Sequence, residues 1–359
     1  MGKTIYILAP YPKGEAPSQR FRFEQYINRL ENEGYQVQMF PFLDEKTWKL
    51  LYAEGKSFQK AIGILKSFLR RWGLMFRLKK ADYVFVHREV AHIGPPIFEW
   101  VMAKVLRIKY IYDFDDATWL PNYSQTNARF NRLKAYWKVK YCIKWAHQVT
   151  AGNDYLANYA KKYNQNVEVI PTTIDLKNHH TEKTNQNRKP LIIGWTGSHT
   201  TMRYLDFIVP IMERLEKKFE FEFHVISNES PKYKLKSLRF IKWNKSSEIR
   251  DLARLHIGIM PLEEDIWSKG KCGFKALQYM ALEIPTVASP VGVNSTIITD
   301  KESGFLCTTP EEWEKILAQL LENQSLREFT GKKGFKTIKE RYSVEANWRK
   351  YLGLFKHSI

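Results

Sequence analysis

The sequence predicts an α/β protein with two doubly wound domains, each built on a parallel sheet. Three observations lead to this fold class. Short runs rich in β-branched and aromatic residues alternate along the chain with segments of helical periodicity, which is typical of parallel sheets with right-handed crossovers. The runs divide into six in each half of the chain. The length of 359 residues and the hydrophobic content of 44% are sufficient for two cores.

The expected strands can be placed in chain order. Those of the first half are residues 4–9, 37–40, 83–87, 110–112, 148–151 and 167–170. Those of the second half are residues 191–195, 221–226, 238–241, 257–260, 286–288 and 304–307. The polar stretch 179–190 is the best candidate for a linker. We therefore expect one domain at residues 1–175, a second at 176–343 and a terminal helical segment at 344–359.

Composition and charge limit the class of protein. No run approaches about 18 apolar residues, so no transmembrane helix is predicted, and the short run 4–9 fits a first strand better than a signal-peptide core. Three scattered cysteines, Cys142, Cys272 and Cys307, argue against a disulfide framework or a zinc site and suit a reducing cytoplasm. The net charge of +19 predicts an anionic partner, which is nucleic acid, an acidic lipid surface or a phosphorylated small molecule.

Residues 56–81 carry much of this charge, with eight Lys or Arg and no acidic residue. Large apolar residues recur there at spacings of three and four, which predicts an amphipathic helix or helix pair; they are Phe58, Ile62, Leu65, Leu69, Trp72 and Phe76. Such a helix can rest in the headgroup region of an acidic membrane. In the alternative interpretation, the apolar residues pack on the domain core and the charges are only solvated.

A glycine-bearing loop and helix at residues 270–281 predict an anion site. Gly270 and Gly273 precede a helix in which apolar residues, beginning with Phe274, recur at helical spacing. Backbone N–H groups and the helix dipole favour an anion at such a helix start. Nearby lysines add full positive charges: Lys269, Lys271 and Lys275. An ordinary helix–strand unit with solvated lysines is the alternative.

Two further loops of the second half follow predicted strands, where open α/β sheets bind their ligands. Gly197 and Ser198 come after the first of these strands, and the serine can cap a helix or hold a phosphate. His199 lies in the same loop. The strand 257–260 leads into three acidic residues, and into a tryptophan that can stack on a sugar or base: Glu263, Glu264, Asp265 and Trp267. Each acid taken singly can also be a solvated loop charge.

The first half contains two polar clusters. Arg20 and Arg22 stand at the start of a predicted amphipathic helix, where a guanidinium suits the oxygens of a phosphate, although both can be ordinary surface arginines. Three carboxylates follow an apolar strand directly, namely Asp113, Asp115 and Asp116. Their mutual repulsion suggests metal binding, a general base or a helix cap. Pairing of these acids with Arg88 is the structural alternative.

Several longer blocks of sequence carry a family resemblance. The more specific ones are IGWTGSHTTMRYL (193–205), IGIMPLEEDIWSKGKCGFKALQYMA (257–281), PTVASPVGVN (285–294) and SGFLC (303–307). Weaker ones are APYPKGEAPSQRFRFEQYINRLENEGYQV (9–37), YDFDDATWL (112–120), VTAGNDYLANYA (149–160) and VEVIPTTID (167–175). Together these blocks, spread over nearly the whole chain, resemble family 4 of the retaining glycosyltransferases, which have the GT-B fold.

The resemblance implies two Rossmann-like domains facing a cleft, with the nucleotide-sugar donor bound by the second domain and the acceptor by the first. The last helix is expected to pack back on the first domain. Many members hold the donor diphosphate with an Arg and a Lys, but the matching residues here are Trp195 and Thr200. The compensating charges are then expected from Lys269 and Lys271, or from the first domain.

The family's pair of glutamates is also replaced. The matching residues are Gly270 and Gln278, and the amide of Gln278 can still bond a ribose hydroxyl. Members normally work without a bound metal, which favours Asp115 or Asp116 as the acceptor of a hydrogen bond from the acceptor hydroxyl. The resemblance thus implies that the leaving phosphate guides the acceptor in on the same face of the sugar.

The predicted function is a retaining transferase that moves a sugar from a nucleotide-diphosphate sugar to a hydroxyl of a glycan or lipid-linked acceptor. The expected catalytic residues are Asp115, Asp116, Arg20 and Lys271. The expected donor-binding residues are Gly197, Ser198, His199, Glu263, Asp265, Trp267, Lys269, Gly273, Phe274, Lys275 and Gln278. We expect no metal, and no cofactor apart from the donor substrate.

The predicted location is the cytoplasm, on the inner face of the plasma membrane, in contact with acidic lipid and not with nucleic acid. Two alternatives belong to other classes. The pI near 9.6 and the basic runs interleaved with aromatic residues would also suit a nucleic-acid-binding protein. The replaced glutamate pair would also suit a non-catalytic sugar-nucleotide-binding module.

Overall fold

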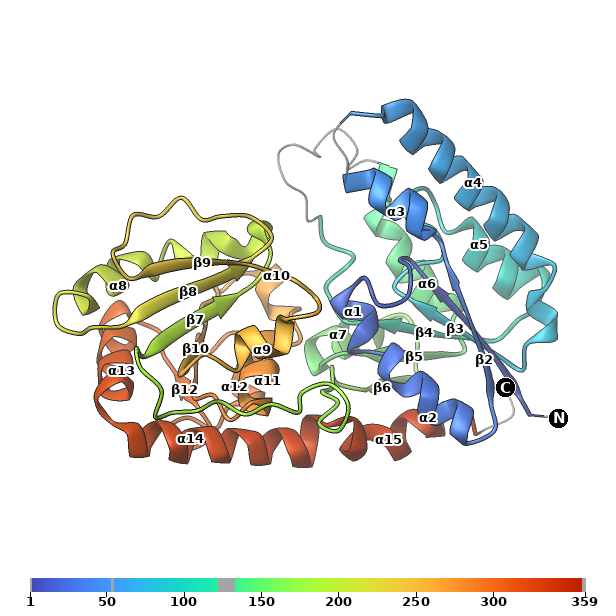
Figure 1. Cartoon of the computed structure of the whole chain (residues 1–359). Helices are drawn as coiled ribbons and strands as arrows, with labels where there is room; N and C mark the ends of the chain where they lie inside the picture. The colour runs from blue at the N-terminus through green and yellow to red at the C-terminus, as the bar shows by residue number, and fades with distance from the viewer. Residues whose placement is uncertain (1, 53–54, 122–132, 357–359) are drawn as a thin grey trace. The chain divides into compact units, whose positions relative to one another are not determined.

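A computed structural model of the chain describes residues 2–52, 55–121 and 133–356. The chain forms two compact units, and Figure 1 shows that each is a sheet flanked by helices. Unit 1 consists of residues 1–172 and 348–359, and unit 2 of residues 173–347. The change between the units therefore lies three residues before the predicted boundary at 175.

The sheet of unit 1 has six parallel strands in the order β2-β1-β3-β4-β5-β6. Their bounds are β1 Thr4–Ala9, β2 Gln36–Pro41, β3 Tyr83–His87, β4 Tyr110–Phe114, β5 Gln148–Ala151 and β6 Val167–Val169. The order reverses direction at β1, which places the switch point of the sheet between β1 and β3. Ligands of open α/β sheets bind at such a point, beyond the carboxyl ends of the strands.

The helices of unit 1 are α1 Pro17–Arg20, α2 Ile27–Asn32, α3 Glu45–Tyr52, α4 Ser57–Met75, α5 Ile97–Trp100, α6 Val139–Trp145 and α7 Asp154–Ala160. Strands β3 and β4 are buried along their whole length, so they form the centre of the core. The last residues of the chain complete this core. The ring of Tyr351, in α15 (Val344–Gly353), stacks on Tyr26 at 4.0 Å between ring centroids, and Phe355 packs against Tyr83.

The sheet of unit 2 also has six parallel strands, in the order β12-β11-β10-β7-β8-β9. Their bounds are β7 Ile192–Thr196, β8 Glu222–Ser227, β9 Leu238–Lys242, β10 Ile257–Met260, β11 Thr286–Ala288 and β12 Phe305–Leu306. Counted from β7, this is the 3-2-1-4-5-6 order of dinucleotide-binding folds, with the switch point between β7 and β10.

The helices of unit 2 are α8 Val209–Leu215, α9 Glu248–Leu252, α10 Ile266–Lys269, α11 Phe274–Ala281, α12 Asn294–Ile297, α13 Pro310–Glu322 and α14 Gln324–Thr337. The core gathers the large side chains of β7, β8 and α13, among them Trp195, Phe223 and Trp313. A capping box starts α13, since Thr309 accepts from the backbone N–H of Glu312 and Glu312 accepts from that of Thr309.

The predicted strands all form, within one or two residues of their expected ends. The predicted linker is wrong. Residues 179–190 belong to unit 2 and pack against it, because Thr184 bonds the backbone of Leu282 and Leu255, and Gln186 bonds His256 and Arg327. The polar composition of this stretch correctly predicted a loop, but the loop forms hydrogen bonds with its own unit.

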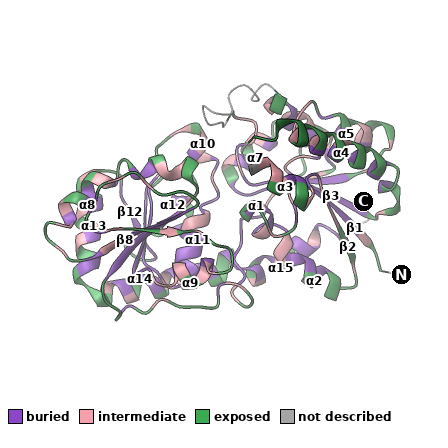
Figure 2. Ribbon diagram, turned by 45° about the horizontal axis from the view of Figure 1, so that its top comes forward, coloured by how far each residue is buried: buried purple, intermediate pink, exposed green. Residues whose placement is uncertain are grey.

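Helix α4 forms as predicted. Its apolar residues face solvent, and they do not pack on the core as in the alternative interpretation. All six apolar residues of the predicted pattern are exposed, from 37% for Ile62 to 83% for Phe76. Figure 2 colours most of α4 as exposed. We call these six residues the apolar stripe: Phe58, Ile62, Leu65, Leu69, Trp72 and Phe76.

The inward side of α4 combines a glycine and polar residues with the buried Leu74 and Met75. Gly63 lies against α3 so closely that an added Cβ would be 2.7 Å from the Cγ2 of Thr47. The buried Arg71 donates to the backbone carbonyl of Phe40 at 2.9 Å and to that of Ala9 at 3.3 Å, at the carboxyl ends of β2 and β1. Directional hydrogen bonds and a close backbone approach therefore fix the helix, and they turn its apolar stripe toward solvent.

Among the described residues, no helix is long and apolar enough to cross a membrane.

Candidate active site

The loops that follow β7 and β10 form the carboxyl edge of unit 2 at its switch point. Gly197 and Ser198 directly follow β7, and the backbone N–H of His199 donates to the Asn228 side chain after β8, at 2.9 Å. His199 also lies 3.2 Å from Glu229. The predicted donor residues Gly197, Ser198 and His199 thus lie together at this edge, with Ser198 and His199 exposed.

The acidic loop after β10 is tied to the segment after β7. Asp265 caps the four-residue helix α10 by accepting the Ser268 N–H at 2.5 Å. Its other oxygen lies 3.8 Å from the guanidinium of Arg203, and the hydroxyl of the neighbouring Tyr204 lies 3.1 Å from the Ser268 hydroxyl. Asp265 therefore has a structural task as a cap. Glu263 and Glu264 are exposed, and Glu264 pairs with Lys269 at 3.2 Å.

Two cations gather around the ring of Tyr204. The Nζ of Lys271 lies 5.8 Å from the ring centroid and the Cζ of Arg203 lies 5.2 Å from it. Lys271 is also 5.9 Å from the ring of Trp267. The hydrogen bond from Arg203 to the Tyr204 hydroxyl is the largest influence on the pKa of Arg203 and raises it, so this cation remains charged. Arg203 belongs to the second half's first resemblance block, but the sequence argument did not single it out.

The predicted Gly-rich helix start is present at α11. Gly273 is the residue before the helix, and its φ of 68° is in the left-handed region that favours glycine. No side chain caps this end. The first-turn residues Phe274 and Lys275 are half-buried, and the Nζ of Lys275 lies 5.6 Å from the Trp195 ring centroid. Trp195 is buried in the core. By the resemblance, its position matches one where family members carry a cation, and the amine of Lys275 lies beside it.

Gln278 lies inside unit 2, where its amide donates to Glu248 of α9 at 3.5 Å. Both side chains are buried. A carboxylate is therefore present close to the position where the family has its second glutamate, although it comes from another helix. Sequence reasoning missed Glu248 because it is 30 residues away and in no recognised block. The position of the first glutamate, Gly270, is buried.

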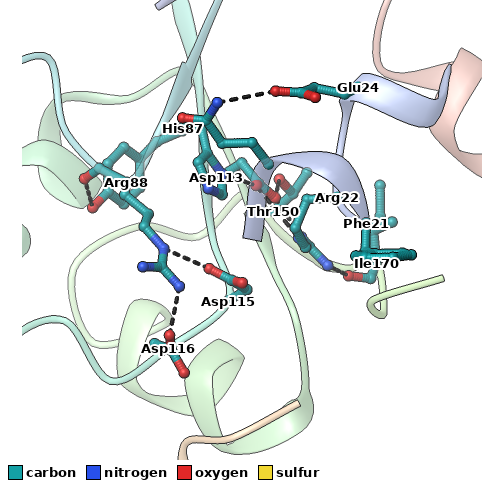
Figure 3. A network of polar contacts seen from close by, with 12 residues as sticks. Phe21, Arg22, Glu24, His87, Arg88, Asp113, Asp115, Asp116, Thr150 and Ile170 are labelled. Atoms are coloured by element: carbon teal, nitrogen blue, oxygen red, sulfur yellow. Dashed lines mark hydrogen bonds and ion pairs between the residues drawn. The ribbon is translucent and has the colours of Figure 1, made fainter. Parts of the chain in front are cut away.

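The carboxyl edge of unit 1 holds a buried polar network centred on Asp113, at the end of β4 (Figure 3). Arg22 forms an ion pair with it, the Nδ1 of His87 lies 2.7 Å from it, and the Thr150 hydroxyl donates to it at 2.7 Å. Burial raises the pKa of Asp113, but the Arg22 charge and the His87 bond outweigh burial and hold the pKa well below its usual range.

This network corrects the prediction for Arg22, which was expected to meet a phosphate. Its guanidinium is buried and bonds Asp113 and the carbonyl of Ile170, so it has no surface to offer a ligand. Arg20, two residues earlier, is the half-buried last residue of α1, and its guanidinium lies 5.0 Å from the Phe21 ring centroid.

Asp115 and Asp116 pair with Arg88, as the structural alternative proposed. The Nε of Arg88 donates to Asp115 at 2.7 Å, and its Nη2 forms an ion pair with Asp116 at 2.5 Å (Figure 3). Arg88 has a φ of 60°, which a non-glycine residue rarely adopts, and the Tyr112 hydroxyl donates to its carbonyl at 2.6 Å. Arg88 is thus held tightly beside the two carboxylates, at the switch-point edge of the sheet.

A second buried ion cluster follows Arg88. Glu89 accepts from Lys138 at 2.8 Å and lies 2.7 Å from His92. Burial raises the pKa of Glu89, but the Lys138 charge and the His92 bond outweigh it and lower the pKa to about 2. Across residues 2–52, 55–121 and 133–356, no group of three or more His, Cys, Asp or Glu is arranged to hold a metal ion.

A family model described as glycosyl transferases group 1 matches residues 190–323. The matched segment lies within unit 2. It contains both switch-point loops of unit 2, Arg203, Lys271, α11 and the Glu248–Gln278 pair. No curated protein is similar enough in sequence to match the chain.

Solved structures resemble the chain over its whole length. Sucrose-phosphate synthase from Thermosynechococcus elongatus is 12% identical with a TM-score of 0.69, covering 99% of this chain and 98% of that one. The catalytic domain of starch synthase IV from Arabidopsis thaliana, bound to ADP and acarbose, is 10% identical with a TM-score of 0.67, covering 100% and 99%. HepE from Anabaena, in complex with UDP and glucose, is 12% identical with a TM-score of 0.66, covering 99% and 100%.

At these identities the likeness establishes the fold alone, and the fold is GT-B. The predicted fold class is therefore confirmed. The predicted donor residues gather at one edge of unit 2, with the exceptions of Gln278, which is buried, and Asp265, which caps α10. The roles of all these residues in binding and catalysis remain predictions.

Proposed function

We propose that the protein is a retaining glycosyltransferase that moves a sugar from a nucleotide-diphosphate sugar to a hydroxyl of a lipid-linked or cell-surface glycan precursor. The observation that carries the proposal is the match of residues 190–323 to glycosyl transferases group 1, because this segment supplies the whole switch-point edge of unit 2. The solved relatives in complex with UDP, UDP-glucose or ADP support a nucleotide donor.

The donor diphosphate is proposed to lie at the start of α11, between Lys271 and Arg203. Both cations lie at Tyr204, and the positive end of the α11 dipole favours an anion there. When the glycosidic bond to the donor breaks, negative charge grows on the leaving diphosphate. Preorganised cations and N–H groups stabilise that charge, and this is where most of the catalysis should arise.

The ribose of the donor is proposed to bond the Glu248–Gln278 pair. A carboxylate accepts hydrogen bonds from two vicinal hydroxyls well, and an amide can accept one and donate one. Both side chains are buried, so the ribose would reach them only when the side chains that cover them move aside. The pair therefore substitutes for the glutamate that the family has at position 278.

The acceptor hydroxyl is proposed to bond Asp115 or Asp116. Both carboxylates pair with Arg88, which fixes their positions. They are better suited to orient a hydroxyl than to remove its proton. In this arrangement, an oxygen of the departing phosphate accepts the proton of the incoming hydroxyl. The hydroxyl would then attack from the same face of the sugar, so the configuration is retained.

The protein is also proposed to work at the inner face of an acidic membrane, where a lipid-linked acceptor would be found. Exposed lysines of the basic segment support this, including Lys56, Lys66, Lys79 and Lys80. Arg70 and Arg71 do not contribute in the way expected from the sequence. Arg71 is buried against strand ends, and Arg70 pairs with Asp44.

The test is a thermal-shift screen of nucleoside diphosphates and their sugars, followed by transfer assays. A ligand at a hundred times its dissociation constant raises stability by about 2.7 kcal/mol. Nuclear magnetic resonance of the product then gives the anomeric configuration. No stabilisation by any nucleoside diphosphate would overturn the function. Stabilisation without transfer or donor hydrolysis would indicate the non-catalytic module instead.

A further inference from the structure

The apolar stripe of α4 continues onto neighbouring elements of unit 1. The ring of Trp72 lies 4.9 Å from that of Phe98 in α5, which joins the two helices. Beside Phe98, the side chains of Ile97 and Trp100 are 46% and 47% exposed, and Val105, in the turn after α5, is 57% exposed. Single exposed apolar residues are ordinary on a protein surface, but a continuous set across two helices marks an interaction surface.

This surface ends in a hollow of about 230 Å³ between α5 and α6. Its walls are prolines, one isoleucine and four aromatic residues: Pro95, Pro96, Ile97, Trp100, Trp137, Tyr141 and Trp145. A sugar or nucleotide site needs several convergent polar groups to orient its ligand. The side chains here offer mainly apolar faces, so the hollow suits a hydrocarbon chain. Ile97 and Trp100 belong both to the hollow and to the surface that continues from α4.

Cations border the apolar surface on both sides. Along α4 and the following turn, Lys56, Lys66, Lys79 and Lys80 are exposed, and the segment 56–81 contains no acid. At the hollow, the Nζ of Lys140 lies 5.0 Å from the Tyr141 ring centroid, and Lys144 is exposed one helical turn further on. A hydrocarbon-compatible face bordered by lysines complements an acidic bilayer, with acyl chains below and anionic headgroups around.

The same charges disfavour a second copy of the chain as the occupant. In a two-fold interface the same patch meets itself, so the lysines of one copy would approach those of the other. The residues that α4 buries are Gly63, Ser67, Arg71, Leu74 and Met75, so the stripe lies outside this contact, except for Trp72, whose ring meets Phe98. Its apolar character is therefore available for a partner.

We propose that this face of unit 1 inserts into the hydrocarbon edge of an acidic bilayer, with the α4 stripe immersed and one lipid acyl chain in the hollow between α5 and α6. The proposal deepens the membrane association proposed above, and it is independent of the sugar-transfer chemistry. A contact made by lysines alone would stop at the lipid headgroups. In the proposed contact, aromatic and aliphatic side chains also reach the acyl chains below the headgroups. Trp100 and Trp137, at 47% and 53% exposure, are the natural anchors at the interface.

The experiment uses the full chain and vesicles of phosphatidylglycerol and phosphatidylcholine, with bromine placed on the acyl chains as a quencher of tryptophan fluorescence. One variant removes the stripe: Phe58→Gln, Leu65→Gln and Leu69→Gln. Glutamine is a good helix former, and all three positions are at least 60% exposed, so α4 should remain folded. A second variant carries Trp100→Gln and Trp137→Gln. The control is Phe329→Gln, half-exposed on α14 of unit 2.

We expect acyl-chain bromine to quench the wild type and the control equally. The stripe variant should bind acidic vesicles about tenfold more weakly or worse and lose quenching. The tryptophan variant should lose part of the quenching, because Trp72 of the stripe and Trp145 of the hollow remain, and it should lose less binding than the stripe variant. Binding without acyl-chain quenching in the wild type would overturn insertion and leave a contact by charge alone. Equal vesicle binding of wild type and stripe variant would also overturn it, as would a stripe-dependent dimer seen by sedimentation with unchanged vesicle binding.

Nucleoside diphosphate binding and transfer to a short soluble acceptor are measured with the same proteins. They should be unchanged by the stripe and tryptophan substitutions, because the donor-site residues lie in unit 2. Failed insertion with intact nucleotide binding would refute only the membrane inference. Intact insertion without nucleotide binding in the wild type would refute only the transferase.

Discussion

Gln278 of α11 donates its side-chain amide to Glu248 of α9 at 3.5 Å, and both residues are buried. A carboxylate thus lies beside Gln278, but it belongs to α9 and not to α11, where the resemblance expects it. Inspection of the motif on α11 alone could not find Glu248, because this residue is 30 positions away in the sequence.

If the Glu248–Gln278 pair binds the ribose, the affinity for a nucleoside diphosphate should depend on the ribose hydroxyls. Glu248→Gln should weaken the binding of a nucleoside diphosphate by about 1–3 kcal/mol, because a charge-assisted hydrogen bond becomes a neutral one. It should weaken the 2′,3′-dideoxy analogue much less. Calorimetric titration of both ligands checks this, with Glu322→Gln on the exposed end of α13 as control. Equal losses for the two ligands would place Glu248 away from the ribose.

The cation pair around Tyr204 predicts where the diphosphate is held. Lys271→Ala and Arg203→Ala should each weaken nucleoside diphosphate binding by about 1–3 kcal/mol, the scale of a lost hydrogen bond to a charged group. The nucleoside without phosphates should bind the variants and the wild type alike. Lys315→Ala, exposed on α13, is the matched control. Unchanged diphosphate affinity in both variants would remove this pair from the site.

The buried Arg22–Asp113 pair predicts a large effect on folding. Arg22→Ala should lower the free energy of unfolding by about 3–5 kcal/mol, because it leaves a buried carboxylate without its cation. Urea denaturation measures this loss. Arg349→Ala, exposed in α15, should change the free energy of unfolding by less than about 0.5 kcal/mol. A small effect at Arg22 would mean that His87 and Thr150 alone satisfy Asp113.

Acid stability should depend on Glu89. Its pKa in the folded protein is about 2, against an ordinary value of 4.5, so its ionised form favours folding. That contribution is complete above pH 4.5 and disappears as the pH falls toward 2. The difference in unfolding free energy between wild type and Glu89→Gln should therefore shrink over this range. Glu31→Gln, exposed on α2, is the control for the substitution itself. A difference in unfolding free energy between wild type and Glu89→Gln that does not change with pH would contradict the stabilising role of ionised Glu89.

Transfer is expected to need no divalent metal. Arg88 holds Asp115 and Asp116, and Arg22 holds Asp113, so each of these carboxylates already has a cationic partner. Transfer should therefore persist in a chelator, measured as released nucleoside diphosphate. Loss of activity that Mg²⁺ or Mn²⁺ restores would require Asp113, Asp115 and Asp116 to be reinterpreted as metal ligands.

The strands were predictable because buried parallel strands are short apolar runs that end in glycine, proline or polar residues, as in residues 83–87 and 257–260. The donor loops followed from their places after these strands. Partners distant in sequence could not be predicted in this way. Arg22 and Asp113 are 91 residues apart, and only the pairing order of β1, β3 and β4 brings their segments together.

For α4 the sequence left two orientations open, with the apolar side at a membrane surface or packed on the core. Periodicity identifies an apolar side of a helix, but it does not say what that side contacts. Here the opposite side contains Gly63 and Arg71, whose close approach and hydrogen bonds depend on where α3 and the ends of β1 and β2 lie. Three-dimensional placement therefore decided which side of the helix is buried.

The two units differ in when they can be completed during synthesis. Unit 2 is one continuous stretch, residues 173–347, so its core is available as soon as that stretch has left the ribosome. Unit 1 needs Tyr351 stacked on Tyr26, and the Tyr35 hydroxyl bonded to the carbonyl of Phe355 at 3.0 Å. Its first 172 residues must therefore wait for the last dozen, which reverses the usual order in which the earlier domain folds first. Removal of residues 348–356 would leave unit 1 without these contacts, whereas all residues of unit 2 would still be present.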